Sequence, residues 1–164
     1  MCIRDRISSD VDSDWEEGDS DKYDLVIMRH VLEHFLDPLA VMKKVRKVLS
    51  RDGLLYLAVP NNLKPTKNLE GRWFRVVHTY YFNRMSLYNL FALAQLEILE
   101  VGEGDQFNQA EIFLVARRAS EMLNPKIESA DFIKQRDVFE NQLKKENGII
   151  PRFKRTINDL LKKS

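Results

Sequence analysis

The sequence predicts an α/β protein whose elements run strand, helix, strand, long loop, helix, strand, strand, with helices at the carboxyl end. Three observations lead to this order. Two short apolar runs, residues 25–28 and 54–59, flank a segment with helical periodicity. A second periodic segment precedes two further strand-like runs, at residues 96–101 and 112–116. After Arg118 the pattern is helical.

The first strand, the helix and the second strand form one unit. Residues 25–28 are a continuous apolar run, which is typical of a strand covered on both faces. Asp37 and Pro38 predict the start of the helix, as its N-cap and first residue, and Gly53 predicts its end. Because the connections are short, the strand at residues 54–59 should follow in a right-handed βαβ unit.

A long connection over residues 62–83 comes next, and loops of this length usually carry function or lack order. Residues 86–95 predict a helix. Residues 96–101 alternate apolar and charged, as in a strand with one exposed face, residues 102–109 predict a polar turn, and residues 112–116 predict an antiparallel partner strand. The aromatic residues of the connection either line a ligand pocket or pack the loop onto the sheet; they are Trp73, Tyr80, Tyr81 and Phe82.

The two ends of the chain differ from its middle. Residues 1–22 are acidic and lack hydrophobic periodicity, so we expect them to be poorly ordered. Residues 131–146 and 151–162 predict helices, the second with an apolar stripe that needs a partner surface. We therefore divide the chain into the acidic segment 1–22, an α/β part at 23–118 and a helical extension at 119–164.

The composition limits the function classes. The net charge of +1 gives no general attraction to nucleic acid or membranes. Cys2 is the only cysteine, which excludes an internal disulfide and a cysteine-based zinc site and fits the reducing cytoplasm, where we expect the protein. No apolar run approaches the roughly 20 residues that span a bilayer. The basic residues after Pro151 predict a solvated surface or peripheral contact with an anionic membrane, and their lack of interleaved aromatics argues against a specific nucleic-acid partner.

Four motifs occur in one order along the chain. Residues 23–38 run from Tyr-Asp through an apolar strand to Val-Leu-Glu-His and then Asp-Pro. Residues 48–55 lead through a turn into the second strand, which stops at Val-Pro-Asn, residues 59–61. A His-Thr-Tyr-Tyr-Phe element begins at His78. Together they resemble class I S-adenosylmethionine-dependent methyltransferases, in particular the group of the ubiquinone-pathway O-methyltransferases and methyltransferase types 11 and 23. The resemblance covers residues 23–116.

The resemblance implies the carboxyl-terminal half of a Rossmann-like methyltransferase sheet, whose last strand is antiparallel. The family's first strand and glycine-rich turn have no counterpart in this sequence, so we expect a fragment with an uncovered apolar sheet edge. The implied activity is methyl transfer from S-adenosylmethionine to an acceptor of unknown identity: a small molecule, a lipid or a glycan precursor. We expect the fragment alone to bind S-adenosylmethionine weakly or not at all and to be inactive.

The strand ends supply the candidate site. Ligands of open α/β sheets bind outside the carboxyl ends of the strands, which places Met28, Arg29 and His30 on the cofactor side. The resemblance implies that the position of Arg29 contacts the methionine part of S-adenosylmethionine. His34 and His78 are the candidate catalytic bases, because histidine titrates in the useful range and an acceptor hydroxyl or amine must lose a proton. The alternative for both histidines is a structural hydrogen-bonding role.

The segment from His30 to His34 also offers metal ligands. As His-x-x-Glu-His it matches an inverted zinc-protease motif, which requires a helix. Methyltransferase relatives bind a divalent ion with a Glu-x-x-Glu-His version, so the resemblance implies His30, Glu33 and His34 as ligands, with His78 as a further one. Otherwise Glu33 and His34 stabilise the loop and cap the following helix. Two alternatives to methyl transfer remain open: a zinc-dependent hydrolase and a non-catalytic Rossmann-like interaction module.

Overall fold

A computed structural model of the chain describes a four-stranded sheet with three α-helices and one 3-10 turn. The described residues are 20–65, 69, 73–74, 77–106, 109–126 and 130–147. The elements are β1 (Tyr23–Arg29), η1 (Leu32–His34), α1 (Pro38–Val48), β2 (Leu49–Pro60), α2 (Arg84–Leu93), β3 (Leu96–Gln106), β4 (Gln109–Arg118) and α3 (Ala130–Glu146). Their order is the predicted one. Most of the acidic segment 1–22 and the expected helix at 151–162 lie outside the described residues.

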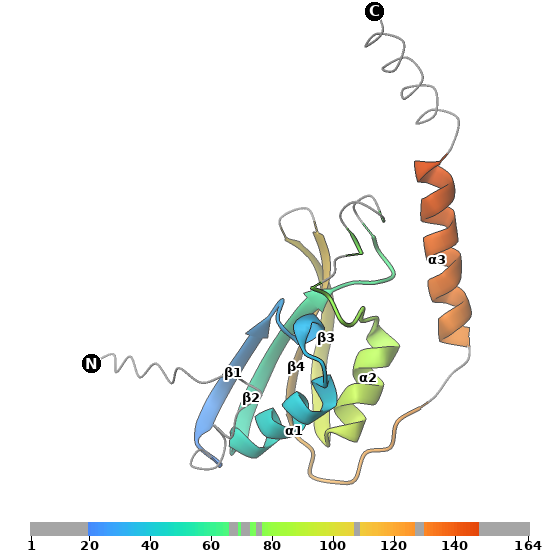
Figure 1. The fold of residues 1–164 in the computed structure, drawn as a ribbon. Coiled ribbons are helices and arrows are strands. Elements are labelled where there is room, and N and C mark those ends of the chain that lie inside the picture. Colours follow the sequence, from blue (N-terminus) through green and yellow to red (C-terminus); the bar gives the residue numbers. More distant parts are fainter. Residues whose placement is uncertain are drawn as a thin grey trace, which may run out of the picture.

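The strands lie in the order β1-β2-β4-β3 (Figure 1). β1 pairs parallel with β2, as the predicted βαβ unit requires, whereas β4 pairs antiparallel with both β2 and β3. The expectation of an antiparallel last strand is therefore confirmed. Because β4 runs opposite to its neighbours, its amino end lies at the edge where β1, β2 and β3 end. We call this edge the carboxyl rim.

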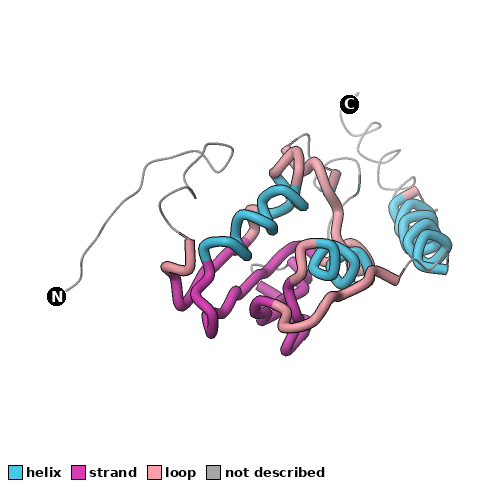
Figure 2. The backbone as a smooth tube through the Cα atoms, turned by 90° about the horizontal axis from the view of Figure 1, so that it is seen from below, coloured by secondary structure: helices cyan, strands magenta, loops and turns pink. Residues whose placement is uncertain are grey.

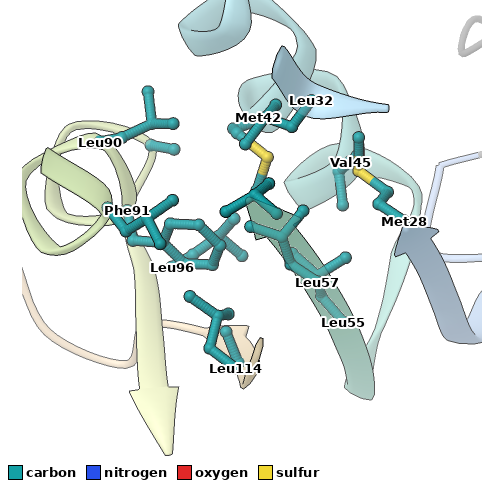
Figure 3. Close-up of a cluster of buried hydrophobic side chains, with 14 of the residues drawn as sticks. Met28, Leu32, Met42, Val45, Leu55, Leu57, Leu90, Phe91, Leu96 and Leu114 are labelled. Atoms are coloured by element: carbon teal, nitrogen blue, oxygen red, sulfur yellow. The ribbon is translucent and has the colours of Figure 1, made fainter. Parts of the chain in front are cut away.

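The core lies between the sheet and the two helices α1 and α2, which cover one face (Figure 2). Figure 3 shows Met42 of α1 and Phe91 of α2 converging on Leu57 and Leu114 of the central strands. All four side chains are buried, and each such burial stabilises the fold by roughly 1.5–3 kcal/mol. Asp37 caps α1 as predicted, since its side chain accepts a hydrogen bond from the Ala40 amide at 2.9 Å.

The opposite face of β1 is open. Leu25 and Ile27 are 56% and 64% exposed, and no described element covers them. The expectation that residues 25–28 are covered on both faces is therefore wrong for this structure, because alternate residues of a strand face opposite sides and only Val26 and Met28 pack against the core. The expected uncovered apolar edge is present, since β1 is an edge strand.

Two glycines have other roles than the predicted ones. Gly53 does not end the helix but lies within β2, where a Cβ atom would come within 2.6 Å of the Tyr23 carbonyl oxygen. Gly102 lies in β3, where a Cβ would come within 2.2 Å of the Phe113 ring on β4. Most of the predicted polar turn at residues 102–109 therefore belongs to the paired strands β3 and β4. Gly102 has no side chain, so the Phe113 ring of β4 can lie against its backbone. No helix of the described residues is long and apolar enough to cross a membrane.

Candidate functional site

The chain leaves β1 through a left-handed residue. His30 has φ 50°, a conformation that histidine tolerates better than most side chains. Its amide donates to the Ala58 carbonyl of β2 at 2.9 Å, so the turn begins while the backbone is still bonded to the sheet. The next residues form only the three-residue turn η1, from Leu32 to His34. The helix that an inverted zinc-protease motif needs is absent from this described segment, which removes the support for the zinc-hydrolase alternative.

Glu111 of β4 joins the two charged residues at the end of β1. Its carboxylate accepts from the Arg29 guanidinium at 3.3 Å and lies 2.9 Å from His30 Nε2. Glu111 is only 7% exposed, so this group brings a buried negative charge to the carboxyl rim. The sequence analysis missed Glu111 because it assigned the preceding residues to a turn. The available signal was one acidic residue directly before the apolar run of residues 112–116.

Met28 differs from its two neighbours. Its side chain is buried in the core beneath α1 and points away from solvent (Figure 3). Only its backbone remains for the predicted contact with a cofactor. Of the three predicted cofactor-binding residues, Arg29 and His30 thus present side chains at the carboxyl rim, whereas the Met28 side chain belongs to the hydrophobic core.

Glu33 is a buried carboxylic acid in η1. It is 2% exposed, and burial raises the pKa of its carboxyl above the ordinary value, against the opposing effects of a backbone hydrogen bond and of His34 and His30. Its Oε1 lies 3.8 Å from a ring nitrogen of each of these histidines. Its Oε2 has no hydrogen-bond partner among the described residues.

His34 and His78 lie against each other. Their rings meet edge to face with centroids 4.9 Å apart. His34 Nδ1 lies 2.8 Å from the Val77 carbonyl oxygen, which can only accept a hydrogen bond, so this nitrogen carries the proton. In the neutral ring Nε2 is then unprotonated, and it is the nitrogen 3.8 Å from Glu33. The two predicted catalytic histidines are thus neighbours in space. The Val77 carbonyl that orients His34 lies 43 positions later in the sequence.

The described residues whose donor atoms could hold a metal ion differ from the predicted set. One donor atom each from Glu33, His34 and His78 lies within 4.8 Å of the other two. His30 is not in this group: its Nε2 lies against Glu111, although its Nδ1 is 3.8 Å from Glu33 Oε1. The structural alternative, that Glu33 and His34 cap the following helix, is wrong in one part, because Asp37 is the N-cap of α1.

The loop after β2 closes the rim. The amides of Thr79 and Tyr80 donate to the Glu33 carbonyl at 2.8 and 3.2 Å, which ties the loop to η1. Of the loop aromatics, Trp73 and Phe82 are buried and pack the loop onto the protein. Asn62, just after β2, is fully buried, and its side-chain amide has no partner among the residues described here. No sequence signal distinguished this asparagine from a simple strand terminator.

Comparison with known proteins places the chain in a family. The model of a methyltransferase domain family matches residues 3–101, well over half of the sequence. The chain therefore belongs to this methyltransferase domain family. In contrast, none of the curated proteins matches its sequence significantly.

Solved structures share the fold at low sequence identity. The [4+2]-cyclase SpnF matches with 13% identity and a TM-score of 0.50, over 62% of this chain and 53% of its own. A chain of the Haloferax volcanii complex between the Trm112 methyltransferase activator and a methyltransferase matches with 13% identity and a TM-score of 0.53, over 63% and 57%. An S-adenosylmethionine-dependent methyltransferase from Clostridium acetobutylicum matches with 12% identity and a TM-score of 0.49, over 60% of this chain and 59% of its own. The first two likenesses show the fold alone, and the chain spans little more than half of each of these two structures.

Proposed function

We propose that the protein takes part in methyl transfer from S-adenosylmethionine to a small-molecule, lipid or glycan-precursor acceptor at the carboxyl rim. The observation that carries this proposal is the exit of β1, where the backbone turns at His30 while still bonded to Ala58 and presents Arg29 beside it. Open α/β sheets bind ligands at such strand ends, and membership of the methyltransferase domain family supplies the reaction class. The lone Cys2 supports the cytoplasm as the compartment.

The residues at the end of β1 are proposed to hold the methionine part of the cofactor. The Arg29 guanidinium suits a carboxylate, because guanidinium groups form strong charge-assisted hydrogen bonds with carboxylate oxygens. Glu111 fixes the directions of Arg29 and His30, so neither side chain has to be ordered when the cofactor binds. Met28 contributes its backbone, and its buried side chain packs the end of β1 onto the core.

His34 and His78 are proposed to receive the proton of the acceptor. S-adenosylmethionine supplies a methyl group on a sulfonium, and the carbon–sulfur bond breaks as the acceptor atom attacks. Alignment of the two reactants provides much of the rate. A hydroxyl or amine acceptor also loses a proton, and the unprotonated Nε2 of His34 is available because Val77 holds the proton on Nδ1.

As an alternative use of the same side chains, Glu33, His34 and His78 are proposed to hold a divalent ion; His34 Nε2 would then be a ligand of that ion and not the base. The buried, unpartnered Oε2 of Glu33 supports this, since a buried carboxylate oxygen without a partner is costly. The bound ion would lower the pKa of an acceptor hydroxyl. Paramagnetic Mn²⁺ tests the assignment, because it should broaden the ring signals of His34 and His78 before that of His30. Equal broadening of all three histidines, or none, contradicts it.

Calorimetric titration with S-adenosylhomocysteine tests the proposed function, in the longest reading frame that contains this chain. We expect binding, and we expect Arg29→Ala to weaken it by about tenfold, as the loss of one charge-assisted contact predicts. A folded protein that does not bind S-adenosylhomocysteine would favour the non-catalytic interaction module instead.

A further inference from the structure

The last described helix contacts the long loop after β2. Figures 1 and 2 show α3 standing apart from the sheet, with a connection that runs along the outside of the protein. Among the described residues, α3 makes hydrogen bonds to Leu69 and a ring contact with Phe74 of that loop. A helix that adds little to the sheet core and holds one loop has a role that core packing does not explain.

The first contact is a carboxylate that receives a backbone amide. The Leu69 amide lies 3.0 and 3.1 Å from the two oxygens of Glu146, and Leu69 itself is buried. Gln142 donates its side-chain amide to the same carboxylate at 2.9 Å, which fixes its direction. A hydrogen bond to an ionised acceptor is about twice as strong as a neutral one, so Glu146 is a firm anchor for this part of the loop.

The second contact is aromatic. The Phe139 ring lies 5.3 Å from the Phe74 ring, within the range of favourable aromatic pairs. Phe139, Gln142 and Glu146 are three and four residues apart, so they share one face of α3. α3 therefore holds the loop with a single face.

The loop carries this contact to the candidate site through a series of rings. Phe74 meets Tyr81 at 5.3 Å, Tyr81 meets His78 at 5.8 Å, and His78 meets His34 at 4.9 Å. The loop backbone adds the Val77 carbonyl that orients His34. The loop that α3 contacts is thus the same loop that determines the positions of the His34 and His78 rings.

We propose that α3 is a positioning element of the methyltransferase site, in which Phe139 and Glu146 hold the loop so that His78 stays against His34. The catalytic meaning of this arrangement rests on the proposed function, but the arrangement itself does not. Neither residue touches the reacting atoms, and both act through Phe74, Leu69 and the rings beyond them.

Nuclear magnetic resonance of the histidine rings tests the proposal in the 164-residue chain. The chain has only three histidines, so each ring gives its own signal, assigned with single histidine-to-glutamine variants. We expect Phe139→Ala and Glu146→Gln to shift or broaden the signals of His34 and His78. The His30 signal should stay, because its ring is held by Glu111.

Ile133→Ala and Glu140→Gln are the matched controls, because both are exposed residues of the same helix. Ile133 is six residues from Phe139 and so lies off the face that holds the loop, and Glu140 pairs with Arg136 within α3. Both variants should leave all three signals unchanged. Unchanged His34 and His78 signals in Phe139→Ala, or the same shifts in Ile133→Ala, overturn the proposal.

A second measurement covers the case in which Phe139→Ala loses structure. Phe74→Ala removes the same contact from the loop side, and the double variant should shift the signals no further than either single variant, as expected for one shared interaction. Additive shifts overturn the proposal. If the longest reading frame that contains this chain does not bind S-adenosylhomocysteine while these shifts are observed in the 164-residue chain, the proposed function is refuted and the positioning role stands.

Discussion

The two halves of the candidate site are held in different ways. His30 belongs to the sheet, since its amide continues the β1–β2 ladder and its ring reaches Glu111 on β4. Glu33 and His34 belong to η1, and the contacts that fix them come from the loop at residues 77–82. The proposed cofactor half is therefore held by the sheet, whereas the proposed acceptor half is held by its loop. Such a division lets the loop change with the acceptor while the strand end stays constant.

The largest expected effect is a loss of stability in the half of the site that the sheet holds. Gly53→Ala places a Cβ 2.6 Å from the Tyr23 carbonyl oxygen, a backbone atom that cannot move without disturbing the pairing of β1 with β2. We expect a loss of about 2–3 kcal/mol in the free energy of unfolding, measured with urea. Gly104→Ala is the control, because its Cβ would come no nearer than 3.4 Å to a neighbouring atom. Equal losses in both variants would contradict the role of close approach at Gly53.

The next effect concerns the charges that β4 brings to the rim. Glu111→Gln removes the negative charge that Arg29 and His30 share, so both side chains lose their fixed direction. In the longest reading frame that contains this chain, we expect the affinity for S-adenosylhomocysteine to fall by about tenfold, equal to about 1.4 kcal/mol. Glu103→Gln, which changes an exposed acid paired with Lys64 and Arg84, should leave the affinity within twofold, as expected for a surface pair worth about 0–1 kcal/mol. A similar loss in both variants would mean that general charge, and not the Glu111 contacts, sets the affinity.

The same division explains what the sequence could predict. The strand at β1 and the cap at Asp37 depend on neighbours in sequence, and local patterns encode them. Glu111 could not be predicted as a site residue, because its contact with His30 joins positions 81 residues apart in the sequence. His78 was predicted only as a further ligand beside His30, and the folded loop brings it into the group with Glu33 and His34. Local propensity cannot encode a contact that depends on how a long loop folds.

A smaller effect separates the two halves by their dynamics. Asn83 forms a reciprocal cap at the start of α2, with its side chain accepting from the Ser86 amide at 2.8 Å, and it ends the loop. We expect Asn83→Ala to cost about 1 kcal/mol. Native-state hydrogen exchange should then show faster exchange of the Thr79 and Tyr80 amides and unchanged exchange of the His30 amide. Uniform acceleration at all three amides would show that the halves open together.

The smallest effect is a pH dependence of opposite sign for two glutamates. Burial raises the pKa of Glu33 above the ordinary value of 4.5, so the folded state holds this proton more tightly than the unfolded state. Its contribution to stability is therefore full below about pH 4.5 and is lost as the pH rises through the folded pKa. Glu33→Gln cannot lose a proton, so its stability relative to the parent chain should rise across that window.

Glu103 provides the reverse case. The hydrogen bond from Lys64, followed by the charges of Lys64 and Arg84, lowers the pKa of Glu103. Its contribution to stability is present above the unfolded pKa and is lost as the pH falls through the folded one. Glu103→Gln should therefore lose stability relative to the parent chain as the pH rises from acid to neutral, while Glu33→Gln gains. Urea unfolding of both variants with chelator, between about pH 3 and 7, measures the difference, because the pKa of Glu103 lies below 4.5 and that of Glu33 above it. Parallel profiles would mean that burial does not raise the pKa of Glu33.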